Sequence, residues 1–477
     1  MTLPLVPWPA SVRPREGAPL HLAPGTAARA EAEAAASAVT SEHHDAALPD
    51  EGYRLDVDAA GIVVAASAPA GARHARATLA QLVEQGPEGW VIRPVSIADA
   101  PRYPHRGLML DVARHFHPVS TVAWLLDRMA ELKLTHLHLH LTDDQGWRLD
   151  MRSRPALAER ASGTSVGGGP GGFYTRADWD DLLSHAERRG VQLVPEIDLP
   201  GHTHAVGLAH PELCAPPVVT DEVRRVAAEH GGGLPRAGVP YTGLAVGFSS
   251  LRVGEPAVEE FLHDVLGEVC ALTPGDLVHI GGDEALGTDP DDYASLVGLA
   301  AEIVVAHGKT PVAWHEAGRA PLPRGAVGQF WGFRTPSAEH AEAARAFVAR
   351  GGTLVMSPSD AVYLDMKYDP STPLGLTWAD GPTSVERSYE WDPDDIIPGL
   401  PDGAVRGVEA ALWTETIRDR AGVERMAFPR LASAAEIAWS PRSGRERAWP
   451  AFRARLAERV RRWREDGVDA QEIVLTS

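Results

Sequence analysis

The sequence predicts a (β/α)₈ barrel of the TIM type that is preceded by a small α+β domain. The chain has 477 residues, of which 44% are hydrophobic, and this suffices for one large domain and one smaller domain. From about residue 106 onward, short apolar stretches follow one another, and helical patterns separate most of them. Eight apolar strands with intervening helices indicate parallel strands covered on both faces, which favours a closed barrel. We therefore expect the small domain in residues 1–100 and the barrel in residues 101–477.

The eight expected strands are short, apolar and followed by polar residues. In chain order they are 107–113, 134–141, 191–197, 276–282, 310–316, 326–332, 353–358 and 405–413. Helical patterns run through 121–133 and 257–272, and a helix that begins after Thr175 as N-cap and stops at Gly190 precedes the third strand. An open doubly wound sheet is the alternative, but no glycine-rich phosphate-binding sequence follows the first strand. The barrel is therefore the favoured fold.

The N-terminal segment has a different pattern. Residues 53–69 (YRLDVDAAGIVVAASAP) indicate two strands that are joined at a glycine turn. Residues 71–85 (GARHARATLAQLVEQ) indicate one helix. We expect these elements to form a small α+β domain that packs on the barrel.

Composition argues against several kinds of partner. A net charge of −20 disfavours nucleic acid and anionic membranes, because both require clustered Lys and Arg. Cys214 and Cys270 have no metal-ligand spacing and form no disulfide framework, so we interpret both as free thiols in a reducing compartment. No apolar run approaches the roughly 18 residues of a membrane span, and no signal peptide is apparent at the start. We expect a soluble, cytoplasmic enzyme or binding protein.

Polar and aromatic residues gather at the C-terminal ends of the expected strands, where a barrel carries its chemistry. In order, they are Asp111 and Arg114, His140, Asp143 and Asp144, Asp198 and His202, Asp283 and Glu284, Trp314 and Glu316, Trp331, Tyr363 and Asp365, and Trp413 and Glu415. Each residue alone has a plain structural explanation, and we expect His136 and His138 to be satisfied packing histidines. Charges and rings at the same end of eight strands are much harder to explain by packing, so they predict a functional site.

The kinds of side chain at these ends favour a sugar ligand. Several carboxylates and one arginine suit hydroxyl groups, which both donate and accept hydrogen bonds. Three tryptophans suit the apolar C–H faces of a sugar ring. A metal site formed by His140, Asp143, Asp198 and His202 is the alternative, but no His-x-x-x-His spacing supports it. A carbohydrate pocket without a metal is therefore the favoured interpretation.

The stretch LVHIGGDEALG (277–287) places two carboxylates, Asp283 and Glu284, side by side. An ordinary glycosidase needs two carboxyls that flank the anomeric carbon, roughly 5 to 9.5 Å apart. Neighbouring strand residues point to opposite faces, with Cα atoms about 3.8 Å apart, so they are poorly placed to enclose one carbon. They can serve two different atoms of one substrate instead. The tandem therefore indicates a substrate that supplies its own nucleophile.

Seven motifs, each at the end of an expected strand, resemble those of the β-N-acetylhexosaminidases of glycoside hydrolase family twenty. In chain order they are RGLMLDVARHFHP (106–118), HLHLTDDQGWR (138–148), EIDLPGHT (196–203), HIGGDE (279–284), AWHE (313–316), YLDMKYD (363–369) and EAALWTE (409–415). The similarity covers the whole barrel, and the N-terminal segment also resembles the small domain of this family. The resemblance implies release of terminal, non-reducing β-linked N-acetylglucosamine or N-acetylgalactosamine with retention of configuration.

The resemblance also implies separate roles for the adjacent carboxylates. Glu284 would be the general acid and later the base that activates water. Asp283 would orient and polarise the 2-acetamido group, whose carbonyl oxygen attacks the anomeric carbon. The residues that would support the acid and its hydrogen-bond network are Asp143, His140, Asp198 and His202.

The remaining strand-end residues would hold the sugar. By resemblance, Arg114 would bind the 3- and 4-hydroxyls, Glu415 the 4- and 6-hydroxyls, and Asp365 the 6-hydroxyl. Tyr363 would donate a hydrogen bond to the acetamido carbonyl. The rings that would wall the acetamido group and the sugar are Trp314, Trp331 and Trp413. No metal or organic cofactor is implied, and the expected partner is an N-acetylhexosaminide, with the oligomeric state left open.

Two other functions remain as alternatives. A disaccharide-releasing enzyme on the same fold would need an open pocket floor, whereas the full set of hydroxyl ligands suggests a closed pocket for one sugar. A catalytically silent sugar-binding protein would not need the acid, and the intact pair Asp283–Glu284 argues against it.

Overall fold

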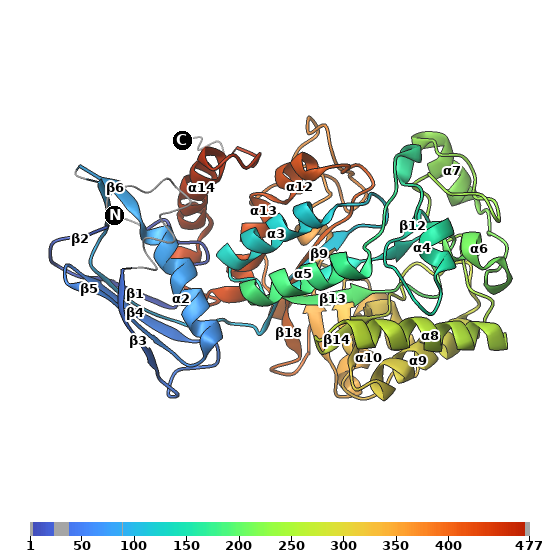
Figure 1. Cartoon of the computed structure of the whole chain (residues 1–477), viewed down its shortest axis with the longest axis horizontal. Coiled ribbons are helices and arrows are strands. Elements are labelled where there is room, and N and C mark those ends of the chain that lie inside the picture. The colour runs from blue at the N-terminus through green and yellow to red at the C-terminus, as the bar shows by residue number, and fades with distance from the viewer. Residues whose placement is uncertain (1–2, 23–37, 88, 473–477) are drawn as a thin grey trace.

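A closed barrel of eight parallel strands forms the larger part of the protein (Figure 1). The computed structural model describes residues 3–22, 38–87 and 89–472. The barrel strands are β9 (His105–Asp111), β10 (His136–His140), β13 (Gln192–Glu196), β14 (Leu277–His279), β15 (Thr310–Trp314), β16 (Val327–Phe330), β17 (Thr353–Met356) and β18 (Val405–Leu412). The strands pair in chain order, and β18 closes the barrel by pairing in parallel with β9. All eight predicted strands and the predicted barrel are confirmed.

Helices in the connections cover the outside of the barrel. The longer ones are α3 (Val119–Glu131), α5 (Arg176–Arg189), α8 (Pro256–Leu272), α9 (Pro290–Ala306), α10 (Ala338–Ala349), α13 (Arg430–Trp439) and α14 (Trp449–Glu465). Local signals define α5 at both ends. The Thr175 hydroxyl accepts from the Asp178 amide, and the Asp178 carboxylate accepts from the Thr175 amide. Gly190 ends the helix with a φ of 70°, so the predicted start and stop of this helix are confirmed.

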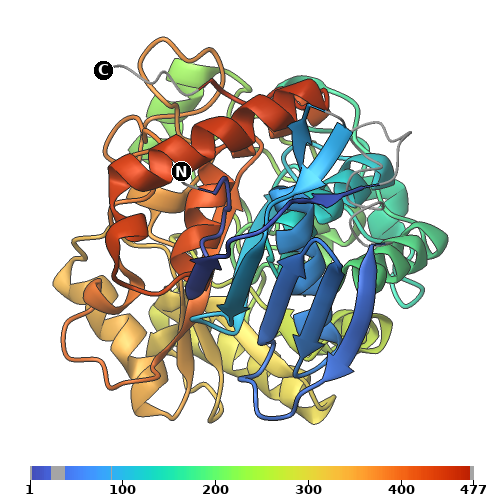
Figure 2. The same ribbon diagram turned by 90° about the vertical axis from the view of Figure 1, so that its left-hand side faces the viewer.

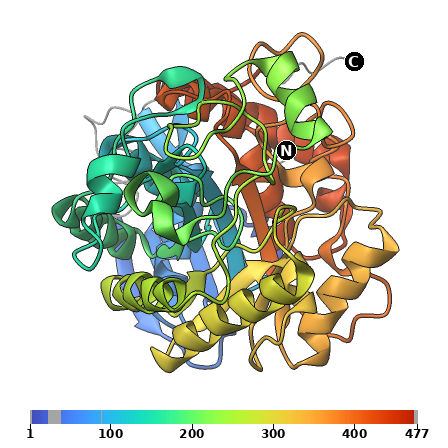
Figure 3. The same cartoon turned by 90° about the vertical axis from the view of Figure 1, so that its right-hand side faces the viewer.

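The connections on the side away from the N-terminal sheet are long and carry short helices (Figures 1 and 3). These are α4 (Ala156–Ala161), α6 (Val206–Ala209), α7 (Asp221–His230), α11 (Ser359–Val362) and α12 (Arg420–Ala427). The connection between β13 and β14 holds α6 and α7 as well as α8. In parallel α/β barrels, loops at the C-terminal strand ends build the functional site.

The N-terminal domain is a mixed sheet with one helix packed on it (Figure 2). Its strands are β1 (Ser11–Pro14), β3 (Val39–His44), β4 (Tyr53–Asp58), β5 (Gly61–Ala66) and β8 (Val95–Asp99), in the order β1-β8-β4-β5-β3. The predicted hairpin is β4 and β5, and the predicted helix is α2 (Pro69–Leu82). Sequence patterning did not predict β1, β3 or β8. Neither β1 nor β3 buries a regular apolar face, whereas β8 alternates buried and less buried residues and was missed despite this pattern. A further three-stranded sheet contains β2 (Leu20–His21), β6 (Glu84–Gly86) and β7 (Gly89–Ile92).

A buried ion pair joins the sheet to the barrel. Lys133, at the end of α3, donates from Nζ to Asp99 Oδ2 and to the Tyr53 hydroxyl, each at 3.0 Å. The Trp439 indole also donates to Asp99, and the Lys133 ammonium lies 4.2 Å from the centre of that ring. The Asp99 carboxylate of the N-terminal domain and the Lys133 ammonium of the barrel therefore each have partners in the other domain, which makes the contact between the two domains specific.

Across residues 3–22, 38–87 and 89–472, no helix has both the length and the apolar character that crossing a bilayer requires.

Candidate active site

The chain turns sharply after β14, and this turn carries the two adjacent carboxylates. Gly281 and Gly282 have φ angles of 68° and 104°, which favour glycine. A Cβ atom on Gly281 would lie 1.7 Å from Asp198 Oδ1, so only glycine allows this approach between the ends of β14 and β13. The Gly282 amide donates to the same Oδ1 at 3.0 Å. The two glycines and Asp198 thereby fix the position of Asp283 and Glu284.

Asp283 and Glu284 approach one histidine from the same side. His202 Nε2 lies 3.9 Å from Asp283 Oδ2 and 3.6 Å from Glu284 Oε2. Asp283 is 7% exposed, whereas the Glu284 side chain is 35% exposed. Glu284 has a φ of 45°, in the left-handed region, so its side chain leaves the strand direction. One carboxylate therefore lies deep in the site and the other faces its opening.

The opposite nitrogen of His202 faces Asp143. His202 Nδ1 lies 3.3 Å from Asp143. Asp143 Oδ2 also accepts from His140 Nε2 and forms an ion pair with Arg114 Nη2, each at 2.8 Å. Burial alone would raise the pKa of Asp143, but the charges of Arg114 and His202 and the hydrogen bonds from His140 and His202 together outweigh burial and hold that pKa well below its usual range. Asp143 is therefore an anion that orients three cationic or polar groups around it.

Asp283 and the neighbouring Asp198 each have one carboxylate oxygen without a partner among the described residues. In the described part of the chain, Asp198 Oδ2, Asp283 Oδ1 and His202 Nε2 are buried without a hydrogen bond. Burial, together with the nearby charge of Glu284, raises the pKa of Asp283 to about 6, although His202 opposes this shift. Burial and the charge of Asp283 raise the pKa of Asp198 well above its usual value. Unpartnered buried carboxylates are costly, which indicates that a ligand completes their hydrogen bonds.

Aromatic rings from three strand ends form one wall. Trp314 is fully buried, and its indole donates to Glu196 Oε1 at 2.9 Å. The Trp413 ring lies 6.0 Å from that of Trp314 and 6.2 Å from that of Tyr363, as measured between centroids. The Arg114 guanidinium lies 4.7 Å from the centre of the Trp413 ring. The aromatic wall thus contacts the Arg114 guanidinium, which also forms the ion pair with Asp143.

Sequence reasoning gave no role to two residues beside this wall. Glu316 accepts from the Trp331 indole with both carboxylate oxygens at 3.0 Å and so fixes the orientation of that ring. The position of Glu316 directly after β15 was a signal in the sequence, but the sequence does not show that Trp331 is its hydrogen-bond partner. Trp378 is 48% exposed and stands edge-on to Trp331 and Tyr363, with centroids 6.2 and 5.7 Å away. It lies in a loop without a periodic pattern, so no sequence signal identified it.

Asp365 and Glu415 form a second group of unpartnered carboxylates. Neither oxygen of Asp365, nor Glu415 Oε2, has a hydrogen-bond partner among the residues described. Burial raises the pKa of Glu415 to about 7, with Arg114 acting in the opposite direction. Burial and the charge of Glu415 raise the pKa of Asp365 well above its usual value. These oxygens are available to accept hydrogen bonds from hydroxyl groups of a ligand.

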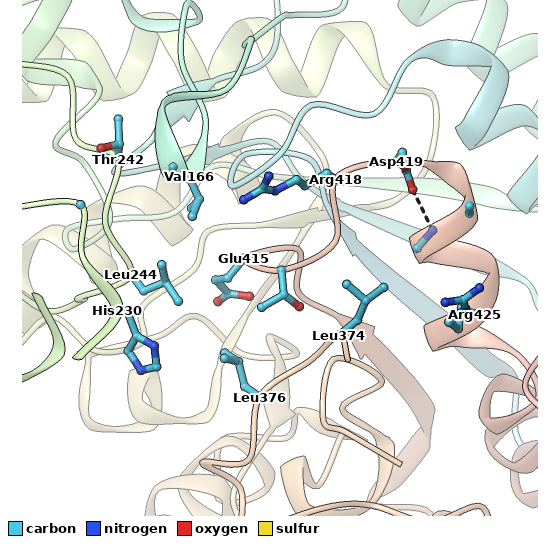
Figure 4. A pocket seen from close by; sticks show the side chains of 15 residues that line it. Val166, His230, Thr242, Leu244, Leu374, Leu376, Glu415, Arg418, Asp419 and Arg425 are labelled. Carbon is cyan, nitrogen blue, oxygen red and sulfur yellow. Dashed lines mark hydrogen bonds between the residues drawn. The ribbon is translucent and has the colours of Figure 1, made fainter. Parts of the chain in front are cut away.

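A cavity of about 640 Å³ adjoins Glu415 (Figure 4). Its walls come from the loops after β10, β13 and β17 and from the segment after β18, and they include Val166, Leu244 and Leu376. The Glu415 side chain reaches into the centre of this view, and Arg418 lies near Val166. Glu415 therefore belongs both to the group at the strand ends and to the wall of a neighbouring cavity.

The predicted site residues are linked through these contacts, with none left apart. Among the described residues, four groups of buried ligand-type atoms lie within 4.8 Å of one another, as a metal would require. Two of these subsets are Asp198, His202 and Asp283, which are all predicted site residues, and His140, Glu196 and Asp198, in which Glu196 was not predicted. In the second subset, His140 and Glu196 are already hydrogen-bonded to each other. The first subset consists of the same atoms that face the opening between Asp283 and Glu284. Its chemistry fits a polar substrate group as well as a cation.

Comparison with known proteins identifies the family. The catalytic-domain model of glycosyl hydrolase family 20 matches residues 103–442, and the model of domain 2 of that family matches residues 16–100. A β-N-acetylhexosaminidase of Cellulomonas fimi is 43% identical over 87% of this chain and 79% of its own.

Solved structures agree over almost the whole chain. A family 20 β-N-acetylglucosaminidase is 46% identical with a TM-score of 0.91, covering 99% of this chain and 98% of the other. The N-acetyl-β-hexosaminidase of Streptomyces plicatus, solved in complex with Thio-NAglucal, is 41% identical with a TM-score of 0.86, covering 98% and 96%. The chain therefore belongs to glycosyl hydrolase family 20 and is a β-N-acetylhexosaminidase.

Proposed function

We propose that the enzyme releases single terminal, non-reducing β-linked N-acetylglucosamine or N-acetylgalactosamine residues, and that the acetamido group of the substrate is the nucleophile. The observation that carries this proposal is the approach of Asp283 and Glu284 to the same nitrogen of His202, at 3.9 and 3.6 Å. Both carboxyls therefore stand on one side of the site. An ordinary pair would stand on opposite sides of the anomeric carbon.

In this mechanism Glu284 protonates the leaving oxygen, because it is the exposed member of the pair and faces the opening. Asp283, buried and unpartnered at Oδ1, accepts the acetamido N–H and directs the carbonyl oxygen to the anomeric carbon. That attack forms a five-membered oxazolinium ring and breaks the glycosidic bond. Glu284, now ionised, then takes a proton from the water that opens the ring, so the configuration is retained.

The strand-end groups around the pair suit the rest of the sugar. The pocket offers Arg114 and the free oxygens of Asp365 and Glu415 to its hydroxyls. Tyr363 lies beside Trp413, where its hydroxyl serves the acetamido carbonyl. The rings that enclose the sugar and its acetamido group are Trp314, Trp331 and Trp413. Glu415 stands between Arg114 and the neighbouring cavity, which favours a pocket closed behind one sugar.

A panel of aryl β-glycosides tests this proposal. Aryl N-acetylglucosaminide or N-acetylgalactosaminide should be cleaved, whereas the plain β-glucoside and β-galactoside should be essentially inert because they lack the nucleophile. A thiazoline analogue of the cyclised intermediate should bind much more tightly than N-acetylglucosamine. Rapid cleavage of a β-glucoside, or a sugar trapped on a protein carboxylate, would return the enzyme to the ordinary two-carboxylate mechanism. Release of an intact disaccharide from an aryl disaccharide would show an open pocket.

We also propose that the enzyme works in the cytoplasm. Cys214 and Cys270 are both free thiols, and Cys270 is buried in the barrel wall, as expected where no oxidising machinery acts on them. Fractionation of the producing cells should find the activity in the cytoplasmic fraction. Activity confined to the medium or the cell envelope would contradict this location.

A further inference from the structure

Buried charges of alternating sign connect the barrel interior with the site. Glu409, on β18, accepts from His138 Nδ1 at 2.9 Å, and His138 Nε2 lies 3.0 Å from Glu196 Oε2. The same Oε2 accepts from His140 Nδ1. His140 Nε2 then contacts Asp143, which contacts His202. These side chains come from β10, β13 and β18 and from the segments that follow β10 and β13, and all are at least nine-tenths buried.

His140 carries two protons in this arrangement. Its Nδ1 faces Glu196 and its Nε2 faces Asp143, and both contacts are at hydrogen-bond distance. Arg114 Nη1 also lies near Nε2, but at 3.3 Å it is farther away than the Asp143 oxygen at 2.8 Å. Two carboxylates can be satisfied only if both ring nitrogens carry a proton, because a neutral imidazole has a single N–H. Burial opposes the charge, but the charges and hydrogen bonds of Glu196 and Asp143 together outweigh burial and raise the pKa of His140 well above its usual value. The imidazolium of His140 therefore depends on Glu196.

We propose that Glu196 is a positioning residue for the general acid Glu284, acting through His140, Asp143 and His202. Glu196 keeps His140 doubly protonated, and His140 then holds Asp143 by a charged hydrogen bond at 2.8 Å. Asp143 in turn orients the ring of His202, whose other nitrogen faces Glu284 at 3.6 Å. The proposal rests on Glu284 being the acid, as proposed above.

The side chains in contact with Glu196 all present nitrogen atoms, so none of them can supply the negative charge that Glu196 provides. Its Oε2 accepts from His138 and His140, while its Oε1 accepts from the Trp314 indole at 2.9 Å and lies 2.9 Å from His279 Nδ1. Every neighbour thus presents a nitrogen, and four of them converge on two oxygens. A glutamine side chain at this position would present one oxygen acceptor and one NH₂ donor. It could therefore not accept hydrogen bonds at both positions that the two carboxylate oxygens occupy. Loss of the charge should therefore release the second proton of His140.

Glu196→Gln and Glu409→Gln form a matched pair for the test. Both glutamates are buried in the same cluster and both contact His138, but only Glu196 contacts His140. Steady-state rates should be measured over aryl N-acetylglucosaminides whose leaving groups range from good to poor. General acid catalysis typically contributes about 10²–10⁴-fold, which bounds the effect.

We expect Glu196→Gln to lower kcat on substrates with poor leaving groups by roughly 10–100-fold, which is part of the total contribution of general acid catalysis. The KM of the variant should stay within about threefold of that of the parent enzyme. The loss should shrink as the leaving group improves, since proton donation then matters less. Glu409→Gln should stay within about threefold of the parent enzyme on all substrates. Equal losses in the two variants, or a loss in Glu196→Gln that is uniform across leaving groups, would overturn the proposal and leave Glu196 a structural residue.

Glu284→Gln, measured beside these variants, separates this proposal from the proposed function. If Glu284→Gln shows no dependence on the leaving group, the assignment of the acid fails. If Glu284→Gln shows it and Glu196→Gln does not, only the role of Glu196 fails. Should Glu196→Gln not fold, ¹⁵N NMR of histidine-labelled parent enzyme decides. The His140 signal, identified by its absence in His140→Gln, must be doubly protonated at the optimum pH, and a neutral ring would overturn the proposal.

Discussion

Two groups of buried carboxylates in the same barrel differ in how they are paired. In the interior, Glu409 accepts from His105, His138 and Gln329. The pKa of Glu409 stays well below its usual range because the hydrogen bonds and charges of His105 and His138 together outweigh burial. At the strand ends, Asp283 and Asp365 keep oxygens without partners, and burial raises the pKa of both. The carboxylates of the two groups are buried to a similar degree. The difference between their pKa values therefore comes from whether their oxygens have partners.

The difference separates structural charges from functional ones. A buried carboxylate that has its partners stabilises the fold, whereas an unpartnered one is costly and persists only where something else selects it. At the strand ends, we propose that the N–H and O–H groups of a sugar are the missing partners. Perturbed pKa values in such a cluster are typical of sites that bind or react.

Glu284→Gln should give the largest effect at the strand ends. Turnover of substrates with poor leaving groups should fall by about 10²–10⁴-fold, because general acid catalysis typically contributes that much. Aryl glycosides with good leaving groups should lose far less, since they depart as stable anions. Initial rates over both substrate types measure this effect, and equal losses on both would count against Glu284 as the acid.

Glu409→Leu should give the largest effect in the interior, and on stability rather than on chemistry. Removing this carboxylate leaves His105 Nε2 and His138 Nδ1 without an acceptor, and breaking a buried pair typically costs about 3–5 kcal/mol of unfolding free energy. Urea unfolding followed by circular dichroism measures the loss. An unchanged midpoint would show that the interior pairs contribute no stability.

Asp283→Asn should stabilise the fold while it lowers turnover. The folded pKa of Asp283 is about 6 against an ordinary 3.8, so at pH above 6 the native state carries an ionised carboxylate at a cost of about 3 kcal/mol. The amide removes that cost. The gain should therefore be present above pH 6 and disappear as pH falls from 6 toward and below 3.8, where both states are protonated. Urea unfolding at pH 7.5 and at pH 3.5 checks this. A variant that is less stable at pH 7.5 would contradict the unpaired state of Asp283.

The pH–rate profile should show the smallest of these effects. Asp283 must be ionised to accept the acetamido N–H, so kcat/KM should fall about tenfold per pH unit below a pKa of about 6. In Asp283→Asn the acidic limb should be lost from the residual activity. Its persistence would assign that limb to another group.

Much of the fold follows from local patterns. The eight barrel strands are short apolar stretches bounded by polar residues, and α5 has its cap at Thr175 and its stop at Gly190. Strands β1 and β3 were missed because their residues are mostly exposed, so that pairing with neighbours rather than an apolar pattern holds them. Residue types at strand ends also indicated the sugar site, since parallel strands in a barrel bring those ends together.

The sequence by itself determined the barrel, the tandem at Asp283 and Glu284 and the kinds of group around it, because periodicity and strand ends are local properties. Only the tertiary structure decided which groups share a partner. His202 lies between Asp143 and the tandem, and Glu196 lies between two histidines, through distances set by closure of the barrel. Pairing and burial set the pKa of each carboxylate, and both depend on side chains that are far apart in the chain.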